Sequence, residues 1–250
     1  ARREKGTEVP GRDTVRIVVA GAPPPTSVIE RVGEELGWEF IQIYGLTETA
    51  PLLTVNRARS EWDELASGER ARLLGRAGVP AMGVRLDVDG EGEVLARANH
   101  IMRGYWNQPE ETERAMPGGD WFHTGDGGMF DGDYLAIVDR KKDVIISGGE
   151  NVSSIEVEDT LFDHPAVAET AVIGVPDDKW GETIKALVVV REGENVTAEE
   201  LIAHCRERLS HFKCPTSVEF RDELPRTATG KLQKFVLRKP YWEGRDRQVG

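Results

Sequence analysis

The stretch from Trp121 to Asn151 places carboxylates, a basic cluster and paired glycines at short, fixed spacings. Turn-forming residues alternate there with two short apolar runs, which predicts a loop, two short strands and a second loop. Asp126 falls in a tight turn of the first loop, and Arg140 lies at the far end of the predicted hairpin. A carboxylate that accepts from ribose hydroxyls, backed by a guanidinium donor, would suit a nucleotide. The alternative is a structural ion pair.

The basic cluster and the glycines of this stretch extend the same interpretation. Arg140 and the two lysines after it form a local cationic group that could meet a polyanionic ligand. Gly148 and Gly149 follow a short apolar run, and adjacent glycines after a strand leave room for another group to pass closely. A plain turn explains the two glycines equally well.

A second candidate site begins where the apolar run 40–44 ends, with Tyr44, Gly45, Thr47 and Glu48. Ligands of open α/β sheets bind where strands end. A ring can stack on a base, a glycine lets backbone approach, a hydroxyl can contact phosphate, and a carboxylate can hold Mg2+. The alternative is a strand-to-helix turn with Thr47 as its N-cap. Small residues after an earlier run could also face a flat ring, although they usually mark only a turn: Gly21, Ala22 and Pro23.

The segment from Pro225 to Lys231 invites comparison with a Walker A phosphate loop. That loop begins with glycine and has a hydroxyl residue after its lysine, and Pro225 and Leu232 break both requirements. The segment is better interpreted as a mobile loop that presents Lys231, whose compact charge could stabilise carboxylate and phosphate oxygens in a transition state. A solvated surface lysine is the alternative.

Length and composition limit the class of protein. At 250 residues and 39% hydrophobic, the chain can hold one large domain or two modest ones. Its net charge of -12 argues against a broad nucleic-acid surface. No apolar run approaches the roughly 20 residues of a membrane helix and no signal peptide is evident, so we expect a cytoplasmic protein. Cys205 and Cys214 are too few for a disulfide framework.

The elements that must position these residues begin with an α/β part. An apolar run at 15–20, a helical pattern at 26–36 and the run 40–44 predict a strand-helix-strand unit. A run that is apolar on both faces is typical of a strand inside a parallel sheet, and nothing before residue 15 supplies its neighbours. The charged segment 60–72 predicts a helix or an exposed loop. From 75 to 106, alternating segments separated by glycines predict a small antiparallel or barrel-like unit.

Beyond Lys142 the pattern predicts a compact α+β domain. Ser153 and Glu156 form a capping-box candidate, and Thr197 and Glu200 form another. The expected elements are helices to 162 and to 209, strands at 169–175, 185–190 and 217–220, and a final helix.

The expected fold class is therefore α/β plus α+β. We place the end of a large α/β domain, with its barrel-like unit, at residues 1–139, and a small hinged domain at 140–250. The hinge is expected at 140–143.

Four motifs in this order and spacing resemble the acyl-activating superfamily, which comprises acyl-CoA synthetases, peptide adenylation domains and firefly-type luciferases. They are YGLTETAP (44–51), WFHTGD (121–126), DRKKDVIISGGEN (139–151) and LPRTATGK (224–231). The resemblance implies that a carboxylate attacks the α-phosphate of ATP, which gives acyl-adenylate and pyrophosphate. Coenzyme A then displaces AMP to form a thioester. It also implies Mg2+ and a carboxylic acid substrate. The residues of the third motif are most similar to those of the fatty-acyl and aryl-CoA synthetase branch.

Motif matching assigns a role to each candidate residue. The resemblance implies that Glu48 holds Mg2+, Thr47 contacts phosphate and Lys231 is the adenylation lysine. Lys142 matches the hinge about which the small domain rotates between half-reactions. The remaining implied contacts are adenine at Tyr44, Gly45, Gly21, Ala22 and Pro23, ribose at Asp126 and Arg140, pantetheine at Gly148 and Gly149, and the nucleotide end of coenzyme A at Phe212.

Two features of the sequence depart from the family pattern. Cys214 stands where some members carry an arginine that contacts coenzyme A. The upstream phosphate loop and most of the acyl pocket are absent from these 250 residues, so we expect a portion of a longer enzyme, or a partner N-terminal half, and weak triphosphate binding by the chain alone. Two alternatives stay open: an adenylation domain that loads a carrier protein, and a non-catalytic nucleotide-binding fragment.

Overall fold

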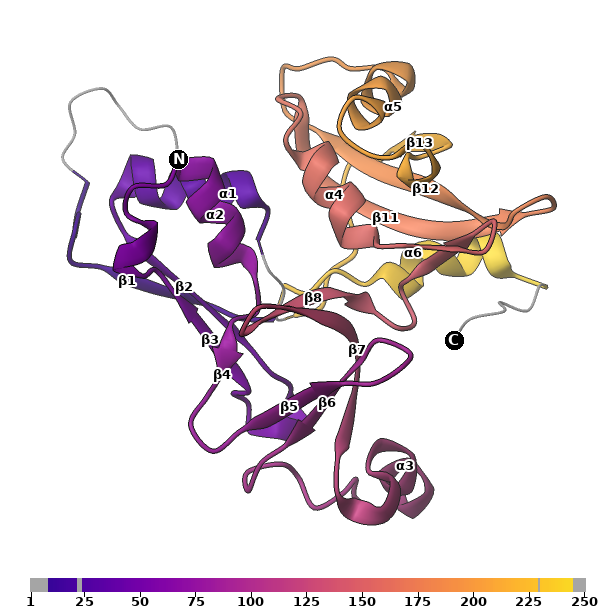
Figure 1. Ribbon diagram of the computed structural model, residues 1–250. Coiled ribbons are helices and arrows are strands. Elements are labelled where there is room, and N and C mark those ends of the chain that lie inside the picture. The colour runs from indigo at the N-terminus through magenta and orange to yellow at the C-terminus, as the bar shows by residue number, and fades with distance from the viewer. Residues whose placement is uncertain (1–8, 22–23, 229, 245–250) are drawn as a thin grey trace. The chain divides into compact units, whose positions relative to one another are not determined.

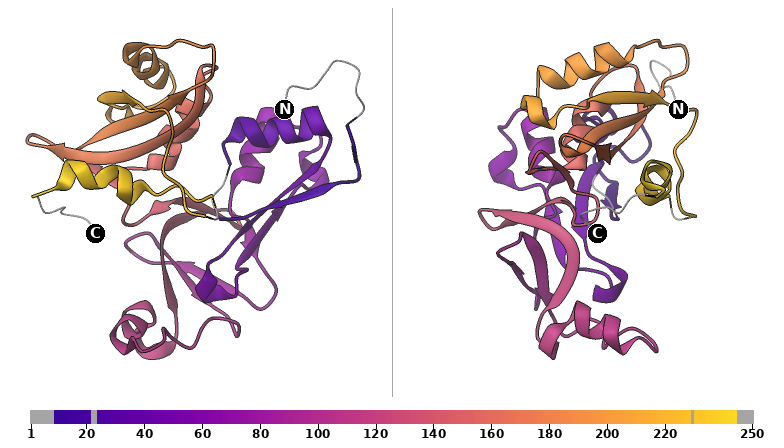
Figure 2. Two further views of the ribbon diagram at one scale, coloured as in Figure 1. Left: turned by 180° about the vertical axis from the view of Figure 1, so that it is seen from behind. Right: turned by 90° about the vertical axis from the view of Figure 1, so that its right-hand side faces the viewer.

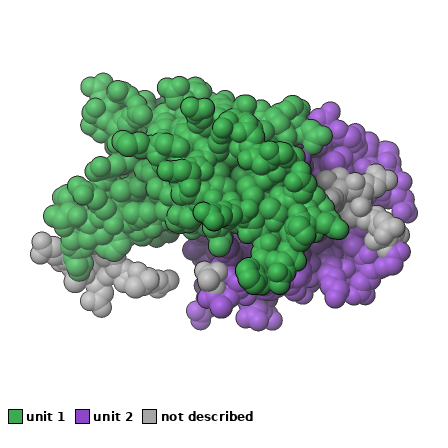
Figure 3. Space-filling view, turned by 90° about the horizontal axis from the view of Figure 1, so that it is seen from below, with its two compact units in different colours: residues 1–124, 129–137 green, residues 125–128, 138–250 purple. Residues whose placement is uncertain are grey.

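The computed structural model describes residues 9–21, 24–228 and 230–244, so Ala22 and Pro23 lie outside the described residues. The chain forms two compact units, coloured separately in Figure 3: residues 1–124 with 129–137, and residues 125–128 with 138–250. Strands β7 (Phe122–Asp131) and β8 (Tyr134–Arg140) contribute residues to both units. The expected α/β and α+β classes are confirmed, while the boundary at 139/140 stays a prediction.

The first unit opens with a sheet of order β1-β2-β3-β4. β1 (Arg16–Val19) pairs in parallel with β2 (Glu39–Tyr44), and β3 (Thr54–Arg57) and β4 (Val79–Pro80) add antiparallel strands. Among the described residues, β1 lies at one edge of this sheet. Helices cover only one face of this sheet (Figure 1), and Val18 on β1 is 56% exposed.

Two helical segments cover that sheet in the first unit. α1 (Thr26–Arg31) continues as a π-helical segment (Val32–Leu36), which confirms the helix expected at 26–36. The charged segment expected as one helix or loop divides into a short 3-10 helix (Ser60–Trp62), in which Trp62 is buried, and α2 (Ser67–Gly75). Trp62 is buried because it packs with α1, α2 and Phe40 of β2 in one apolar cluster.

The barrel-like part of the first unit is an antiparallel sheet of order β5-β6-β7-β8, as expected for 75–106. β5 spans Arg85–Val88 and β6 spans Glu93–Arg97, followed by α3 (Pro109–Ala115) and a 3-10 turn (Pro117–Gly119). The loop predicted at the start of the 121–151 stretch is wrong, because β7 already begins at Phe122. Phe122, Thr124 and Asp126 point inward in alternation, and the polar character of two of them hides the strand pattern.

The second unit is built on a five-stranded sheet of order β10-β9-β12-β11, with β13 paired to β12. α4 and α5 pack on one face of this sheet and α6 on the other, as Figures 1 and 2 show. Each face carries its own apolar cluster, and the two clusters hold the three helices in place. The elements are β9 (Ile145–Ser147), β10 (Glu150–Val152), α4 (Ser154–Phe162), β11 (Val167–Asp177), β12 (Gly181–Val190), α5 (Ala198–Arg206), β13 (Ser217–Phe220) and α6 (Lys234–Trp242).

The two expected capping boxes have different outcomes. At α5, Thr197 and Glu200 exchange both hydrogen bonds of the box. At α4, the Ser153 hydroxyl accepts from Glu156 N, but the Glu156 carboxylate binds Lys213 instead of returning to the helix start. No helix among the described residues has the length and apolar character needed to cross a membrane.

Candidate functional site

The candidate nucleotide edge lies at the carboxyl ends of two neighbouring parallel strands of the first unit. β1 and β2 are in register with Val19 opposite Gln42, so Gly21 and Tyr44 follow at the same edge of the sheet. Gly21 has a φ of 93°, a conformation that favours glycine. The structure thus brings two sequence-predicted positions together, at the kind of edge where open α/β sheets bind ligands.

Gly45 is explained by the fold of its own chain. A Cβ atom at this position would lie 1.6 Å from the Pro51 carbonyl oxygen. The chain returns so closely because Leu53 N donates to the Tyr44 carbonyl at 2.8 Å. The group that approaches this glycine closely is therefore the backbone of residues 51–53 of the same chain.

The turn after Gly45 is held by Thr49. The Leu46 amide donates to the Thr49 hydroxyl at 2.9 Å, and that hydroxyl donates to the Pro51 carbonyl at 2.9 Å. Thr49 is fully buried, whereas Thr47 opens a short 3-10 helix (Thr47–Thr49) with its side chain exposed. The alternative that Thr47 is an N-cap is wrong, because Leu46 holds that position.

The carboxylate of Glu48 is held from one side by Tyr105, which the sequence did not identify. The Tyr105 hydroxyl donates to Glu48 Oε1 at 3.0 Å, and Met102 N donates to the Glu48 carbonyl at 2.8 Å. Burial and then the bond to Glu48 raise the pKa of the Tyr105 phenol. The two residues are 57 positions apart, so no local spacing could predict the contact.

Asp126 and Arg140 meet in the second unit, on adjacent strands. Asp126 lies within β7 rather than in a tight turn, which corrects the expectation, and Arg140 ends β8. Lys141 N donates to the Gly125 carbonyl at 3.0 Å, which fixes the pairing. The Arg140 Nε to Asp126 Oδ1 distance is 3.7 Å, with the carboxylate largely buried and the guanidinium half exposed. This loose ion pair leaves both the ribose role and the structural alternative open.

The predicted hinge residue, Lys142, is bound through its backbone carbonyl by Arg238. Arg238 Nη1 on α6 donates to the Lys142 carbonyl at 3.0 Å and to Asp143 Oδ1 at 3.1 Å. The Lys142 side chain is exposed. The segment just after the predicted pivot is therefore fixed to the last helix of the second unit.

Gly148 and Gly149 form the turn between β9 and β10, with φ values of 61° and 86°. A Cβ on Gly148 would lie 2.8 Å from Trp180 Cε3, and Gly148 N donates to the Trp180 carbonyl at 2.9 Å. The group that passes closely over the first glycine is thus the half-exposed ring of Trp180, a residue the sequence did not single out.

Phe212 is 46% exposed on a short 3-10 helix (His211–Lys213) of the second unit. The neighbouring Lys213 ammonium binds both carboxylate oxygens of Glu156, at 2.8 and 2.7 Å. Cys214 is buried. The aromatic ring is available to a ligand, but the cation beside it is already paired.

The loop that presents Lys231 is tied by several hydrogen bonds in its described part. Thr227 N donates to the Lys231 carbonyl at 2.8 Å, and Lys231 N donates to the Thr227 hydroxyl at 3.1 Å. Arg226 binds the Gly230 carbonyl at 2.9 Å and Glu169 of β11 at 2.7 Å. The described part of the loop is held by these hydrogen bonds and has an exposed lysine side chain at its end, and the expected mobility stays a prediction.

Comparisons with known proteins bear on both units. A family model described as AMP-binding enzyme matches residues 3–106, and one described as AMP-binding enzyme C-terminal domain matches residues 156–231. The chain is 45% identical over 246 residues to 2-methylpropanoate–CoA ligase CCL4 of Humulus lupulus, with 92% of this chain and 44% of that protein covered.

Two solved structures have similar folds. ATP-bound MatB from Rhodopseudomonas palustris matches with a TM-score of 0.80 and 31% identity, over 92% of this chain and 46% of that one. The anthranilate CoA ligase AuaEII in complex with anthranoyl-AMP matches with a TM-score of 0.80 and 32% identity, over 91% of this chain and 45% of that one. The chain spans about half the length of the curated relatives that it matches.

Proposed function

The chain belongs to the acyl-activating superfamily of AMP-binding enzymes, and from that premise we propose that the enzyme carrying it is an AMP-forming acid-thiol ligase. In this proposal a carboxylic acid, fatty or aryl, reacts with ATP to give acyl-adenylate and pyrophosphate, and coenzyme A then displaces AMP. The named relatives are CoA ligases, which favours coenzyme A over a carrier protein as the acceptor. A cytoplasmic location stays a prediction.

The observation that carries the proposal is the strand-end edge in the first unit. Gly21 and Tyr44 end neighbouring parallel strands there, and the exposed Thr47 and the tethered Glu48 follow directly. A backbone edge, an aromatic ring, a hydroxyl and a carboxylate are the groups that bind a base, a phosphate and a metal ion. The closed turn around Gly45 supports this role, because it fixes the direction in which the next residues leave the strand.

Glu48 fits the Mg2+ that the family implies. Mg2+ is commonly held by one or two carboxylates together with substrate phosphates. Tyr105 donates to Oε1 of Glu48, and within the described residues no donor binds Oε2. A bound Mg2+ would neutralise phosphate charge, and in the proposal Glu48 supplies one ligand while Tyr105 keeps the carboxylate in place.

The remaining roles fall in the second unit. Asp126 and Arg140 would bind ribose, and their side chains meet at 3.7 Å on adjacent strands, which supports a shared ligand. Lys142 would be the hinge between half-reactions. Gly148 and Gly149 would line the pantetheine passage, and exposed Phe212 would contact the nucleotide end of coenzyme A.

Lys231 gives the sharpest test, because the proposal assigns it to adenylation alone. We expect Lys231→Ala in the full-length enzyme to reduce acyl-adenylate formation by about 100-fold or more, since a charge that stabilises the transition state is lost. Thioester formation from supplied acyl-adenylate and coenzyme A should be retained. Pyrophosphate exchange measures the first step, and thiol consumption measures the second.

Lys239→Ala is the matched control, because Lys239 is an exposed lysine of the following helix. It should leave both rates unchanged. An equal loss of both half-reactions in Lys231→Ala would contradict the role of this lysine, and absence of pyrophosphate exchange in the unsubstituted enzyme with every acid tried would contradict the proposed function.

A further inference from the structure

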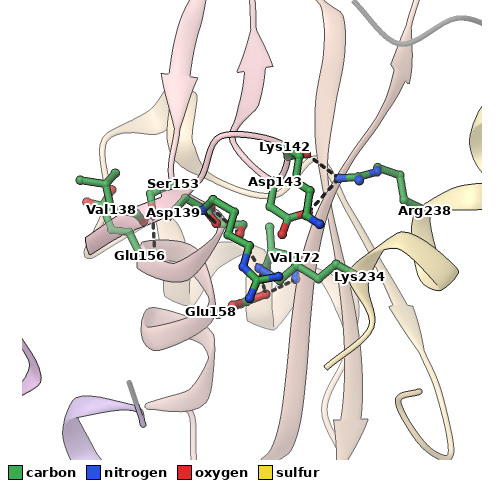
Figure 4. Close-up of polar contacts among 12 residues, drawn as sticks. Val138, Asp139, Lys142, Asp143, Ser153, Glu156, Glu158, Val172, Lys234 and Arg238 are labelled. Carbon is green, nitrogen blue, oxygen red and sulfur yellow. Dashed lines mark hydrogen bonds and ion pairs between the residues drawn. The ribbon is translucent and has the colours of Figure 1, made fainter. Parts of the chain in front are cut away.

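A largely buried ionic network in the second unit has no part in the roles assigned so far. It joins the end of β8, the first two turns of α4 and the start of α6, as Figure 4 shows. Lys234 and Glu158 form its centre, with Nζ to Oε1 at 2.7 Å and side chains only 12% and 19% exposed. Buried ion pairs contribute little net stability, so their presence calls for another explanation.

Lys234 is held by more than one acceptor of α4. Its ammonium donates to the Ser154 hydroxyl as well as to Glu158, and the Glu158 Oε1 atom also accepts from Val172 N at 2.7 Å. Burial raises the pKa of Glu158, against the opposing effect of Lys234. Burial lowers the pKa of Lys234, but the carboxylates of Glu158 and Asp139 outweigh it and raise the pKa overall. Lys234 is therefore a cation held by two acceptors of α4.

The same network reaches the residue before the predicted hinge and two residues within it. Asp139, which is 2% exposed, accepts from the Ser154 amide and hydroxyl, each at 2.6 Å. Arg238 binds the Lys142 carbonyl and Asp143. Lys234 and Arg238 lie one helical turn apart on α6, so this helix is linked to Asp139 through Ser154 and directly to Lys142 and Asp143.

The loop with Lys231 is attached directly to this fixed helix end. Lys231 precedes Lys234 by three residues, and Leu232 between them packs in the apolar cluster under α6. A bridge pairs Leu232 with Arg226, and Gln233 N donates to the Pro225 carbonyl at 2.9 Å. A shift of the start of α6 would therefore carry this loop, and Lys231 with it.

We propose that Lys234 is a positioning residue for the adenylation step, which acts by fixing the start of α6 on Glu158 and Ser154 and thereby placing Lys231. This inference rests on the proposed function of Lys231. The far half of α6 has attachments that do not involve Lys234, because Leu237 and Tyr241 pack in the apolar cluster and Arg238 binds Asp143. Loss of Lys234 should therefore leave the unit folded and free only the helix end next to the loop.

The test is Lys234→Met in the full-length enzyme, with both half-reactions measured. We expect acyl-adenylate formation to fall by about 10- to 100-fold, the range that a misplaced catalytic group produces. Thioester formation from supplied acyl-adenylate should change by less than about twofold, because Lys231 takes no part in it. The ratio of the two rates does not depend on the folded fraction, so a simple loss of stability cannot produce this split.

A double variant keeps the test decisive if Lys234→Met unfolds. Glu158→Gln with Lys234→Met removes both charges, and the glutamine oxygen can still accept from Val172 N. We expect its thermal midpoint to recover relative to Lys234→Met, since no uncompensated charge is buried, while adenylate formation stays low. Full recovery of adenylate formation would show that packing alone positions the loop, and would overturn the proposal.

Cleavage by trypsin after Lys231 in the substrate-free enzyme gives a readout apart from activity. It should accelerate by about tenfold in both Lys234 variants, in line with a locally opened loop, and stay unchanged in Lys239→Met. Equal loss of both half-reactions, or unchanged cleavage, would overturn the positioning role. If Lys231→Ala itself retains adenylate formation, the proposed function of Lys231 fails instead, and the cleavage result still decides whether Lys234 fixes the loop.

Discussion

Residue types alone identified Glu48 as a metal ligand candidate, but not the phenol that holds it. The hydrogen bond from Tyr105 restrains Oε1 of a half-buried carboxylate and leaves its other oxygen to a ligand. Such a contact to a charged group contributes about 1.5–3 kcal/mol. A phenol that orients a carboxylate in this way acts on the reaction only through Glu48.

We expect Tyr105→Phe in the full-length enzyme to slow acyl-adenylate formation by about 10- to 100-fold, the effect of losing one bond to a charged group. The variant should also need more Mg2+ for half-maximal rate, and direct titration calorimetry with Mg2+ and ATP should show weaker binding. Thioester formation from supplied acyl-adenylate should be retained.

Tyr134→Phe is the matched control for this prediction. The Tyr134 hydroxyl is buried without a hydrogen-bond partner among the described residues, so its removal should be neutral or slightly stabilising. Indistinguishable adenylation rates and Mg2+ requirements in Tyr105→Phe and the unsubstituted enzyme would mean that Glu48 needs no such restraint.

At the scale of elements, the sequence predicted most of the second unit because its signals are local. β13 matches the expected strand 217–220, and α5 begins at the expected cap, since both follow from adjacent residues. β7 was missed because two of its inward positions are polar, Thr124 and Asp126, and are buried only through contacts with other strands. The same limit applies to Trp180 over Gly148, a contact set by the pairing of distant strands.

The packing of α5 on its sheet makes a prediction about the cysteines. Cys205 lies on the buried face of α5, and burial raises the pKa of its thiol to about 12. Burial also raises the pKa of Cys214. At pH 8 the thiolate of folded Cys205 should be about 1,000-fold scarcer than that of a free cysteine. We expect iodoacetamide to leave both thiols intact in the folded protein and to modify both in urea.

The raised pKa of Cys205 also makes the free energy of unfolding depend on pH. The unfolded thiol ionises first, so the stability associated with Cys205 is complete below pH 9.0 and is lost as the pH rises toward about 12. Cys205→Ala should therefore flatten the decline in unfolding free energy over that range. Rapid alkylation of the folded protein at pH 8 would mean that α5 opens readily from the sheet.

At the scale of the whole molecule, the predicted hinge lies inside one compact unit. The chain passes from the first unit to the second between residues 137 and 138, ahead of Lys142. The contacts of Asp139 with Ser154, and of the Val138 carbonyl with the Ser153 hydroxyl at 2.5 Å, therefore span the pivot (Figure 4). A rotation about Lys142 must break these contacts. The ease of the rotation therefore depends both on the backbone freedom of Lys142 and on the strength of the contacts around it.

Lys142→Pro tests the pivot in the full-length enzyme. Proline fixes φ near about −65°. A rotation about the backbone of this residue is therefore hindered in either half-reaction. We expect the thioester half-reaction to fall by about tenfold or more, as for other hinge restrictions, and adenylate formation to fall much less. Lys142→Ala removes the same side chain but keeps φ free, and it should preserve the ratio of the two rates. If Lys142→Pro leaves that ratio unchanged, the rotation takes place elsewhere, and the unit boundary at residues 137 and 138 becomes the first place to look.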